Sequence, residues 1–136
     1  MSAHVLRCHG EDLAVGQVAD DVDLGAISGP PLCATLETRT GRTAIFPHRH
    51  RDRIGADAPV EGPFRAFEIQ GPLDFSLTGV LSEVLDPLAR AEISVFTLST
   101  FDTDWIQVPS TPQEPAVAAL RSVGHTVVRV ISEESS

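Results

Sequence analysis

The segment from Gly71 to Gly79, with the sequence GPLDFSLTG, is the part of the chain whose residue types and spacing best fit a binding site. It joins an apolar run rich in strand formers to a segment with helical spacing. The first four N–H groups of a helix lack partners within it and attract carboxylates or phosphates, and glycine lets such a ligand approach closely. The junction therefore predicts an anion-binding position, although a well-capped turn without a ligand is the alternative.

Other clusters of reactive residue types are weaker candidates. His48 and His50 have a spacing compatible with a metal pair, but no third ligand is evident nearby, and a solvated basic rim is the favoured interpretation. His4, Cys8 and His9 lie close together near the amino terminus, where disorder or surface exposure is expected. We therefore predict no metal site.

The sequence contains no nucleophile elbow, Walker loop, GxGxxG, HExxH or kinase signature. Serine and histidine residues are present, but sequence alone gives them no catalytic geometry. We therefore expect a chain that is not an enzyme, with no catalytic residues and no cofactor.

Ten Arg, no Lys and nineteen acidic residues give the 136-residue chain a net charge of -9. This charge opposes phosphate backbones and anionic lipids, so neither nucleic acid nor a membrane is an expected partner. No apolar run approaches the roughly 20 residues of a membrane span and no apolar signal core is present, so the cytoplasm is the expected location. Cys8 and Cys33 are the only cysteines and form no CxxC pattern, so free thiols are expected.

From residue 64 onward, the hydrophobic pattern predicts a regular series of elements. Strand patterns cover residues 64–70, 93–99, 105–108 and 126–131, and helical spacing covers residues 77–88 and 115–123. The strand at 93–99 is apolar on both faces, so it is expected in the middle of the sheet. Pro87 is expected to kink the first helix or distort its last turn, and Gly124 fits the end of the second.

Strand, helix, strand, strand, helix, strand is the order of a ferredoxin-like βαββαβ domain. The predicted fold class is therefore α+β, with antiparallel sheets and helices on one face, and residues 64–136 form the main domain. Residues 1–63 contain a strand at 13–18, a loop or helical turn at 20–27 and a hairpin around Gly41. They predict a shortened unit that packs on the main domain, with Arg49 to Pro63 as the linker.

Two segments resemble ACT domains, and within that family the small tandem-ACT proteins related to the CASTOR-type arginine sensors. One is the Gly71–Gly79 junction, and the other is ISVFTLSTFDTDW, residues 93–105, which is similar to the family's strand and turn opposite the ligand-binding loop. Gly124 and His125 also fit the end of the family's last helix. The resemblance is specific over residues 64–130, whereas residues before 48 look like a degenerate first ACT unit.

The resemblance implies a non-catalytic regulatory module that binds an amino acid between ACT units and acts by a ligand-linked change of conformation or assembly. Asp104 would pair with an ammonium or guanidinium group, and Phe101 would offer an apolar wall or a cation–π face, whereas Asp102 is expected to face solvent. The implied ligand-binding residues are Gly71, Leu73, Asp74, Phe75, Ser76, Leu77, Thr100, Phe101 and Asp104.

The first half of the chain lacks a Gly-Pro-Leu-Asp-Phe loop, so one site per chain is expected. Arginine is suggested by the resemblance alone, and other amino acids are equally compatible with these residues. Two alternatives stay open: an assembly module that dimerises without a ligand, and an accessory subunit of a separate amino-acid-metabolising enzyme. A homodimer, or a partner enzyme or regulator, is accordingly expected.

Overall fold

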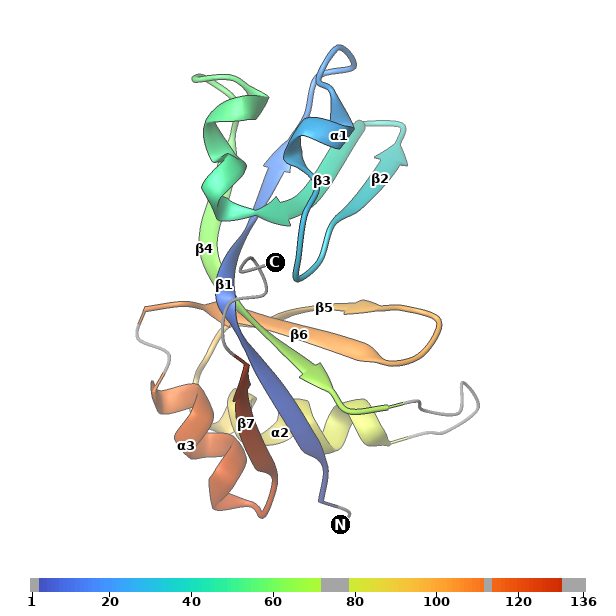
Figure 1. Ribbon diagram of the computed structural model, residues 1–136. Coiled ribbons are helices and arrows are strands. Elements are labelled where there is room, and N and C mark those ends of the chain that lie inside the picture. The colour runs from blue at the N-terminus through green and yellow to red at the C-terminus, as the bar shows by residue number, and fades with distance from the viewer. Residues whose placement is uncertain (1–2, 72–78, 112–113, 131–136) are drawn as a thin grey trace.

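The computed structural model describes residues 3–71, 79–111 and 114–130 (Figure 1). Its strands are β1 (Val5–Gln17), β2 (Ala34–Thr38), β3 (Gly41–Pro47), β4 (Val60–Ile69), β5 (Phe96–Ser99), β6 (Asp104–Pro109) and β7 (Thr126–Val130). Its helices are α1 (Leu24–Ile27), the 3-10 helix η1 (His48–Ile54), α2 (Val80–Arg90) and α3 (Glu114–Ser122). The predicted α+β class is confirmed.

All the strands of the described residues belong to one sheet, with the order β2-β3-β1-β4-β6-β5 and with β7 paired to β1. The long strands β1 and β4 run through both halves of the molecule (Figure 1). Residues 13–17 of β1 pair with β3, whereas residues 5–9 pair with β7. The pairing of β1 with β4 shifts register between Cys8 and Asp12, where the sheet curls. The predicted domain boundary between residues 63 and 64 therefore falls inside β4.

The N-terminal unit, residues 12–65, follows the order β1-α1-β2-β3-η1-β4, and its strands lie in the order β2-β3-β1-β4. This is a complete βαββαβ arrangement. The segment predicted as a linker forms η1 and the start of β4, and Ile54 at the end of η1 is buried. Gly55, at φ +111, ends η1, and Pro59 directly precedes β4.

The C-terminal unit, residues 66–130 together with residues 5–9, has the order β4-α2-β5-β6-α3-β7. It departs from the ferredoxin plan because the first part of β1 lies between β4 and β7. The β1–β7 pair is parallel, and the other strand pairs are antiparallel. Each unit thus uses a strand that continues into the other.

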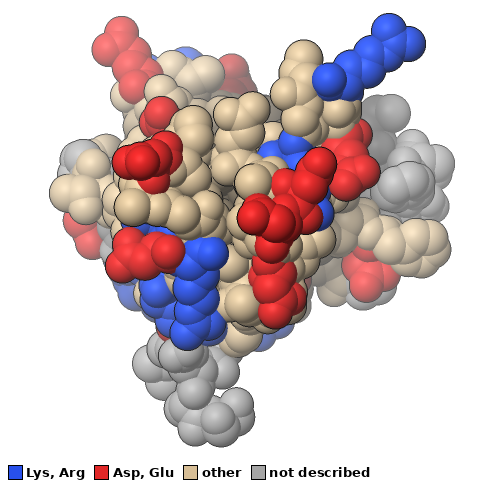
Figure 2. Space-filling view, turned by 90° about the horizontal axis from the view of Figure 1, so that it is seen from above, with Lys and Arg blue, Asp and Glu red and all other residues tan. Residues whose placement is uncertain are grey.

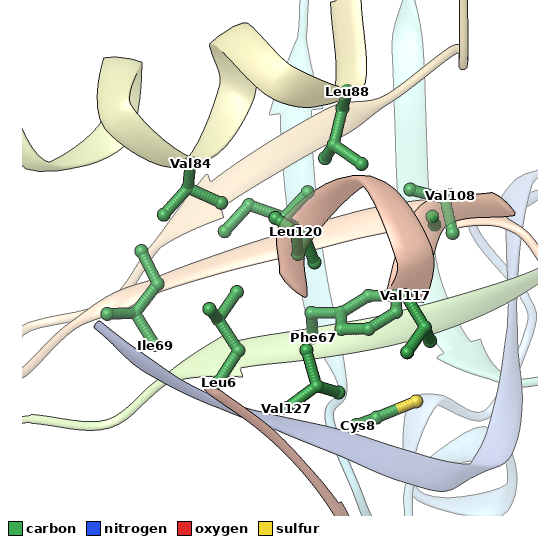
Figure 3. Packing of buried hydrophobic residues seen from close by; sticks show 12 residues of the cluster. Leu6, Cys8, Phe67, Ile69, Val84, Leu88, Val108, Val117, Leu120 and Val127 are labelled. Carbon is green, nitrogen blue, oxygen red and sulfur yellow. The ribbon is translucent and has the colours of Figure 1, made fainter. Parts of the chain in front are cut away.

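Helices α2 and α3 cover one face of the C-terminal unit, as predicted. Val84 and Leu88 of α2 and Leu120 of α3 join a buried cluster with Leu6 of β1 and Phe67 of β4 (Figure 3). Helix α2 continues through Pro87 to Arg90, and Gly124 has φ +98 just after α3, which confirms its predicted place at the helix end. None of the helices in the described residues has the length and apolar character needed to cross a membrane.

Two further clusters complete the core. One packs α1 and η1 against the strands of the N-terminal unit and contains Ile27, Phe46 and Ile54. The other lies on the inner face of the curled sheet and joins the units through residues such as Leu13 and Trp105. The single curled sheet therefore forms the two middle layers of the molecule, and the helices of each unit cover its outer faces (Figure 1).

Two other expectations were also wrong. Among the strands that the structure describes, β5 pairs with β6 alone and lies at the edge of the sheet, whereas its apolar composition predicted a central position. The reason is that Ile93 and Val95, which made the run apolar on both faces, precede the strand and pack on the helical side. Cys8 and His9, expected to be exposed or disordered, are buried in β1.

Candidate functional site

A hollow of about 350 Å³ lies where β4 ends beside the turn between β5 and β6. Three elements contribute to it: β1, the end of β4 and the turn itself. The residues that line it are Arg7, Glu68, Gln70, Gly71, Asp102 and Thr103. The structure thus brings the start of the predicted loop and the predicted turn to one place, although they are about thirty residues apart in the chain.

The turn is fixed to the end of β4 by its own hydrogen bonds. Thr100 N–H donates to the Thr103 carbonyl oxygen over 2.8 Å, and Thr103 N–H donates to Thr100 Oγ1 over 3.3 Å. Thr103 is buried, and its Oγ1 donates to the Ile69 carbonyl oxygen over 2.6 Å. This bond joins the turn to the end of β4, which are two walls of the hollow.

Charges of both signs line the hollow. Arg7 of β1 and Glu68 of β4 are register partners, so both side chains leave the same face of the sheet. Glu68 Oε1 lies 3.0 Å from Nε2 of His9, and the His9 ring stacks on Trp105 with a centroid distance of 4.9 Å. These contacts hold the Glu68 carboxylate, while Arg7 and Asp102 are exposed to solvent.

The implied ligand-binding residues are placed as follows. Gly71 lines the hollow, and Thr100 fixes the turn. Phe101 is 88% exposed, and the Asp104 carboxylate accepts a hydrogen bond from Ser99 Oγ over 2.5 Å without lining the hollow. Asp102, expected to lie mostly in solvent, is exposed and also lines the hollow. The remaining loop residues, Leu73, Asp74, Phe75, Ser76 and Leu77, lie outside the described residues, and their contacts stay a prediction.

Sequence reasoning missed Arg7 and Glu68. The signal available was the alternation of Leu6 and Cys8 with polar neighbours, which is typical of a strand. No local pattern, however, predicts that this strand lies beside β4, because the pairing joins residues about sixty positions apart.

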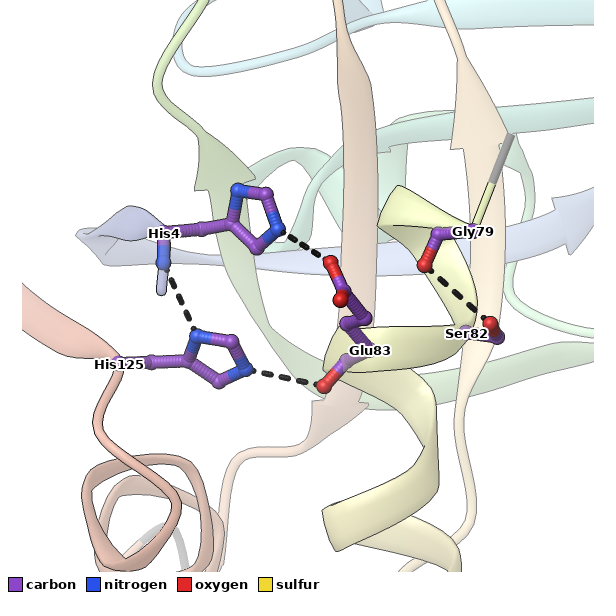
Figure 4. A network of polar contacts seen from close by, with 5 residues as sticks. All are labelled: His4, Gly79, Ser82, Glu83 and His125. Atoms are coloured by element: carbon purple, nitrogen blue, oxygen red, sulfur yellow. Dashed lines mark hydrogen bonds and ion pairs between the residues drawn. The ribbon is translucent and has the colours of Figure 1, made fainter. Parts of the chain in front are cut away.

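A second polar network fixes the first turn of α2 (Figure 4). His4 Nε2 lies 2.9 Å from the Glu83 carboxylate, and the backbone N–H of His4 donates to His125 Nδ1 over 3.1 Å. His125 Nε2 donates to the Glu83 carbonyl oxygen over 2.9 Å, and the His125 side chain is buried. The network therefore ties α2 to the start of β1 and to the connection between α3 and β7.

Within the described ranges, no group of three or more His, Cys, Asp or Glu side chains is arranged to hold a metal ion. Cys8 and Cys33 are both free thiols, as expected. Burial raises the pKa of the Cys8 thiol, so Cys8 stays protonated and inert at neutral pH.

Residues 60–122 match the family model described as ACT domain. The match starts at β4 and ends with α3, so it contains Glu68, the end of β4 and the turn that line the hollow. Among curated proteins, none matches the sequence at a significant level. The family model thus matches most of the segment that sequence analysis found similar to ACT domains.

Several solved structures share the fold over nearly the whole chain. A crystal structure of a protein from Agobacterium tumefaciens has 25% sequence identity and a TM-score of 0.81, covering 96% of each chain. A Vibrio cholerae protein of unknown function has 16% identity and a TM-score of 0.71, covering 88% of this chain and 89% of the other. The ligand-free regulatory subunit of aspartate kinase from Thermus thermophilus has 11% identity and a TM-score of 0.61, covering 90% of this chain and 99% of the other. At identities this low, the last two show the fold alone.

Proposed function

We propose that this chain is a non-catalytic regulatory protein that binds an amino acid in the hollow beside Gly71. The observation that carries the proposal is the joining of a guanidinium, two carboxylates and the backbone of a glycine in one hollow. The ACT domain match supports it. The fold shared with regulatory subunits of aspartate kinases agrees with a regulatory role.

The chemistry of the hollow suits a zwitterion. Arg7 provides a planar guanidinium that can bind a carboxylate through two hydrogen bonds. Glu68 retains lone pairs beyond the one that meets His9, and with Asp102 it can accept hydrogen bonds from an ammonium group. Gly71 has no side chain, so a ligand can approach its backbone.

The proposed contact set also includes the loop residues Leu73 to Leu77, together with Thr100, Phe101 and Asp104, as the resemblance implies. The geometry favours Asp102 over Asp104 as the acid at the hollow, because Asp102 lines the hollow and Asp104 does not. Arginine, suggested by the CASTOR-type resemblance, is one ligand to test among the amino acids.

The shared strands offer a route for regulation. Arg7 lies in β1 and Glu68 in β4, and both strands continue into the N-terminal unit. A ligand that bridges these two side chains favours whichever arrangement of the two units keeps both of them facing the hollow. Binding shifts an equilibrium between arrangements only by the difference in the ligand's affinity for them. The proposed partner is a second copy, or an enzyme or regulator in the cytoplasm.

A thermal-shift screen with each of the twenty common amino acids tests the proposal. A ligand present at 100 times its Kd stabilises the folded state by about 2.7 kcal/mol. Arg7→Gln and Asp102→Asn should remove the shift, whereas the matched control Arg90→Gln, which changes an exposed arginine of α2, should retain it. Asp104→Asn decides between the two acids of the turn. The proposal fails if no amino acid stabilises the protein, or if Arg7→Gln and Asp102→Asn both keep the full shift.

An assembly role is the second candidate, and the edge position of β5 favours it. In the described part of the chain, β5 has β6 as its one neighbouring strand, so its other edge can pair with a strand of a second copy. Light scattering over a dilution series would detect such a dimer, and Thr97→Lys on the exposed face of β5 should weaken it. The space-filling view from above shows acidic side chains scattered over the visible face, with the arginines of the described residues in separate groups among them (Figure 2). That face gives a nucleic acid no continuous basic surface.

A further inference from the structure

The N-terminal unit contains a hollow at the place that corresponds to the one beside Gly71. In both units, the first strand leads to a helix and the next two strands form a hairpin. The hollow beside Gly71 lies between the end of β4 and the β5–β6 turn. The corresponding hollow, of about 660 Å³, lies between the end of β1 and the β2–β3 turn, and residues 54–59 close one side.

Hydrogen bonds fix its two walls in the same manner. Val18 N–H donates to the Arg42 carbonyl oxygen over 2.8 Å, and Arg42 Nη2 donates to the Ala19 carbonyl oxygen. The bond from Arg42 corresponds to the one from Thr103 to Ile69 in the C-terminal unit, because each joins the hairpin to the end of the first strand. Arg42 Nε is buried and has no hydrogen-bond partner among the described residues. Because Nε is shielded, an acceptor in the hollow would meet the outer N–H groups of Arg42, which lines it.

The rest of the lining suits a small zwitterion. Val18 and Ile54 are buried apolar residues at the base of the hollow. Asp20 and Asp57 are exposed and also line it, so carboxylates lie on the same hollow as the guanidinium. A carboxylate can pair with Arg42, an ammonium group with an aspartate, and a short apolar side chain with the base.

We propose that this hollow is a second small-molecule site, which takes an amino acid with a short apolar side chain. Sequence analysis predicts one site per chain because the first half lacks a Gly-Pro-Leu-Asp-Phe loop. The site in the N-terminal unit needs no such loop, because Arg42 of β3 supplies the positive charge and η1 with the following residues supplies a wall. It depends neither on α1, which is a single turn, nor on ligand binding beside Gly71.

Calorimetric titration with each of the twenty amino acids, followed by NMR of the ¹⁵N-labelled chain, tests the proposal. The wild-type chain should bind a small apolar amino acid with shifts in the amide signals of Val18, Ala19 and Gly41. Arg42→Gln should weaken this binding about tenfold or more, because a hydrogen-bonded ion pair is lost. Arg39→Gln is the matched control, since Arg39 lies on the same hairpin but does not line this hollow.

Arg42 also holds the end of β1, so a second variant separates binding from folding. Ala56→Phe adds a ring to an exposed wall residue and removes no hydrogen bond, so it should block the hollow at an unchanged melting temperature. Arg7→Gln, which changes only the hollow beside Gly71, should leave this binding intact. Binding that survives both Arg42→Gln and Ala56→Phe overturns the second site, as does a screen in which no amino acid shifts these signals. If Arg7→Gln abolishes the binding while Arg42→Gln and Ala56→Phe retain it, the ligand binds beside Gly71, and the second site is overturned.

Discussion

Replacement of Gln107 by methionine should stabilise the protein. Gln107 lies in β6 with no exposed surface, and neither Nε2 nor Oε1 has a hydrogen-bond partner among the described residues. Its register partners are Ala66 of β4 and Phe96 of β5, so the amide faces apolar neighbours. A polar group buried in this way has lost its water without gaining a replacement.

The size of the effect follows from that loss. Leaving a buried polar group unpaired costs about 1–3 kcal/mol, and methionine has a similar length and shape without the polar atoms. Gln107→Met should therefore raise the free energy of unfolding by about 1–3 kcal/mol. For a chain of this size, each kcal/mol corresponds to a rise in melting temperature of roughly 3–5 °C.

Urea denaturation followed by Trp105 fluorescence measures the change, and calorimetry gives the melting temperature. Gln17→Met is the matched control, because Gln17 is exposed in β1 and its replacement should change stability by less than about 0.5 kcal/mol. A destabilised or unchanged Gln107→Met variant would refute the reasoning. That outcome would mean that ordered water pairs with the amide.

Two other measurements test features of the core. A thiol reagent at neutral pH should modify Cys33, which is exposed, and should reach Cys8 only on unfolding. The reason is that burial shields the Cys8 thiol and raises its pKa. Equal rates of modification for the two cysteines would contradict this prediction. His125→Leu should lower the free energy of unfolding by about 1–3 kcal/mol, since it removes the ring that accepts from the backbone N–H of His4 and donates to the carbonyl oxygen of Glu83. Urea denaturation measures that loss, and an unchanged midpoint would show that water replaces the ring.

The sequence predicts most of the elements because their signals are local. Apolar spacing predicts the start of α2 to within three residues and the end of α3 to within one, and Gly124 marks where α3 must stop. Strand β4 is found from the alternation after Phe64, although it begins earlier, at Val60. The hairpin around Gly41 is found in the same way, from turn residues between two apolar runs.

The partners of those elements could not be predicted in the same way. The central position given to residues 93–99 fails because burial on two faces can come from a loop before an edge strand as well as from a central strand. Arg7 and Glu68 meet only because β1 enters the sheet of the C-terminal unit. Such pairings depend on the whole set of strands competing for neighbours, which single segments of sequence do not record.

The insertion of β1 bears on whether the C-terminal unit is an independent domain. Within the described residues, β7 pairs with β1 and with no other strand, and β1 also contributes Leu6 and Cys8 to the cluster under α2 and α3. Removal of residues 1–63 should therefore leave β7 unpaired and two apolar positions of that cluster empty. Each lost large side chain of a core costs about 2–5 kcal/mol, and a domain has only about 5–15 kcal/mol of stability.

We accordingly expect residues 64–136 alone to lack a cooperative unfolding transition. Circular dichroism during thermal denaturation and the dispersion of amide NMR signals measure this directly. A well-dispersed spectrum with a sharp transition would contradict the expectation. It would mean that β7 moves beside β4 once β1 is absent, which restores the simple ferredoxin order and makes the C-terminal unit a domain in its own right.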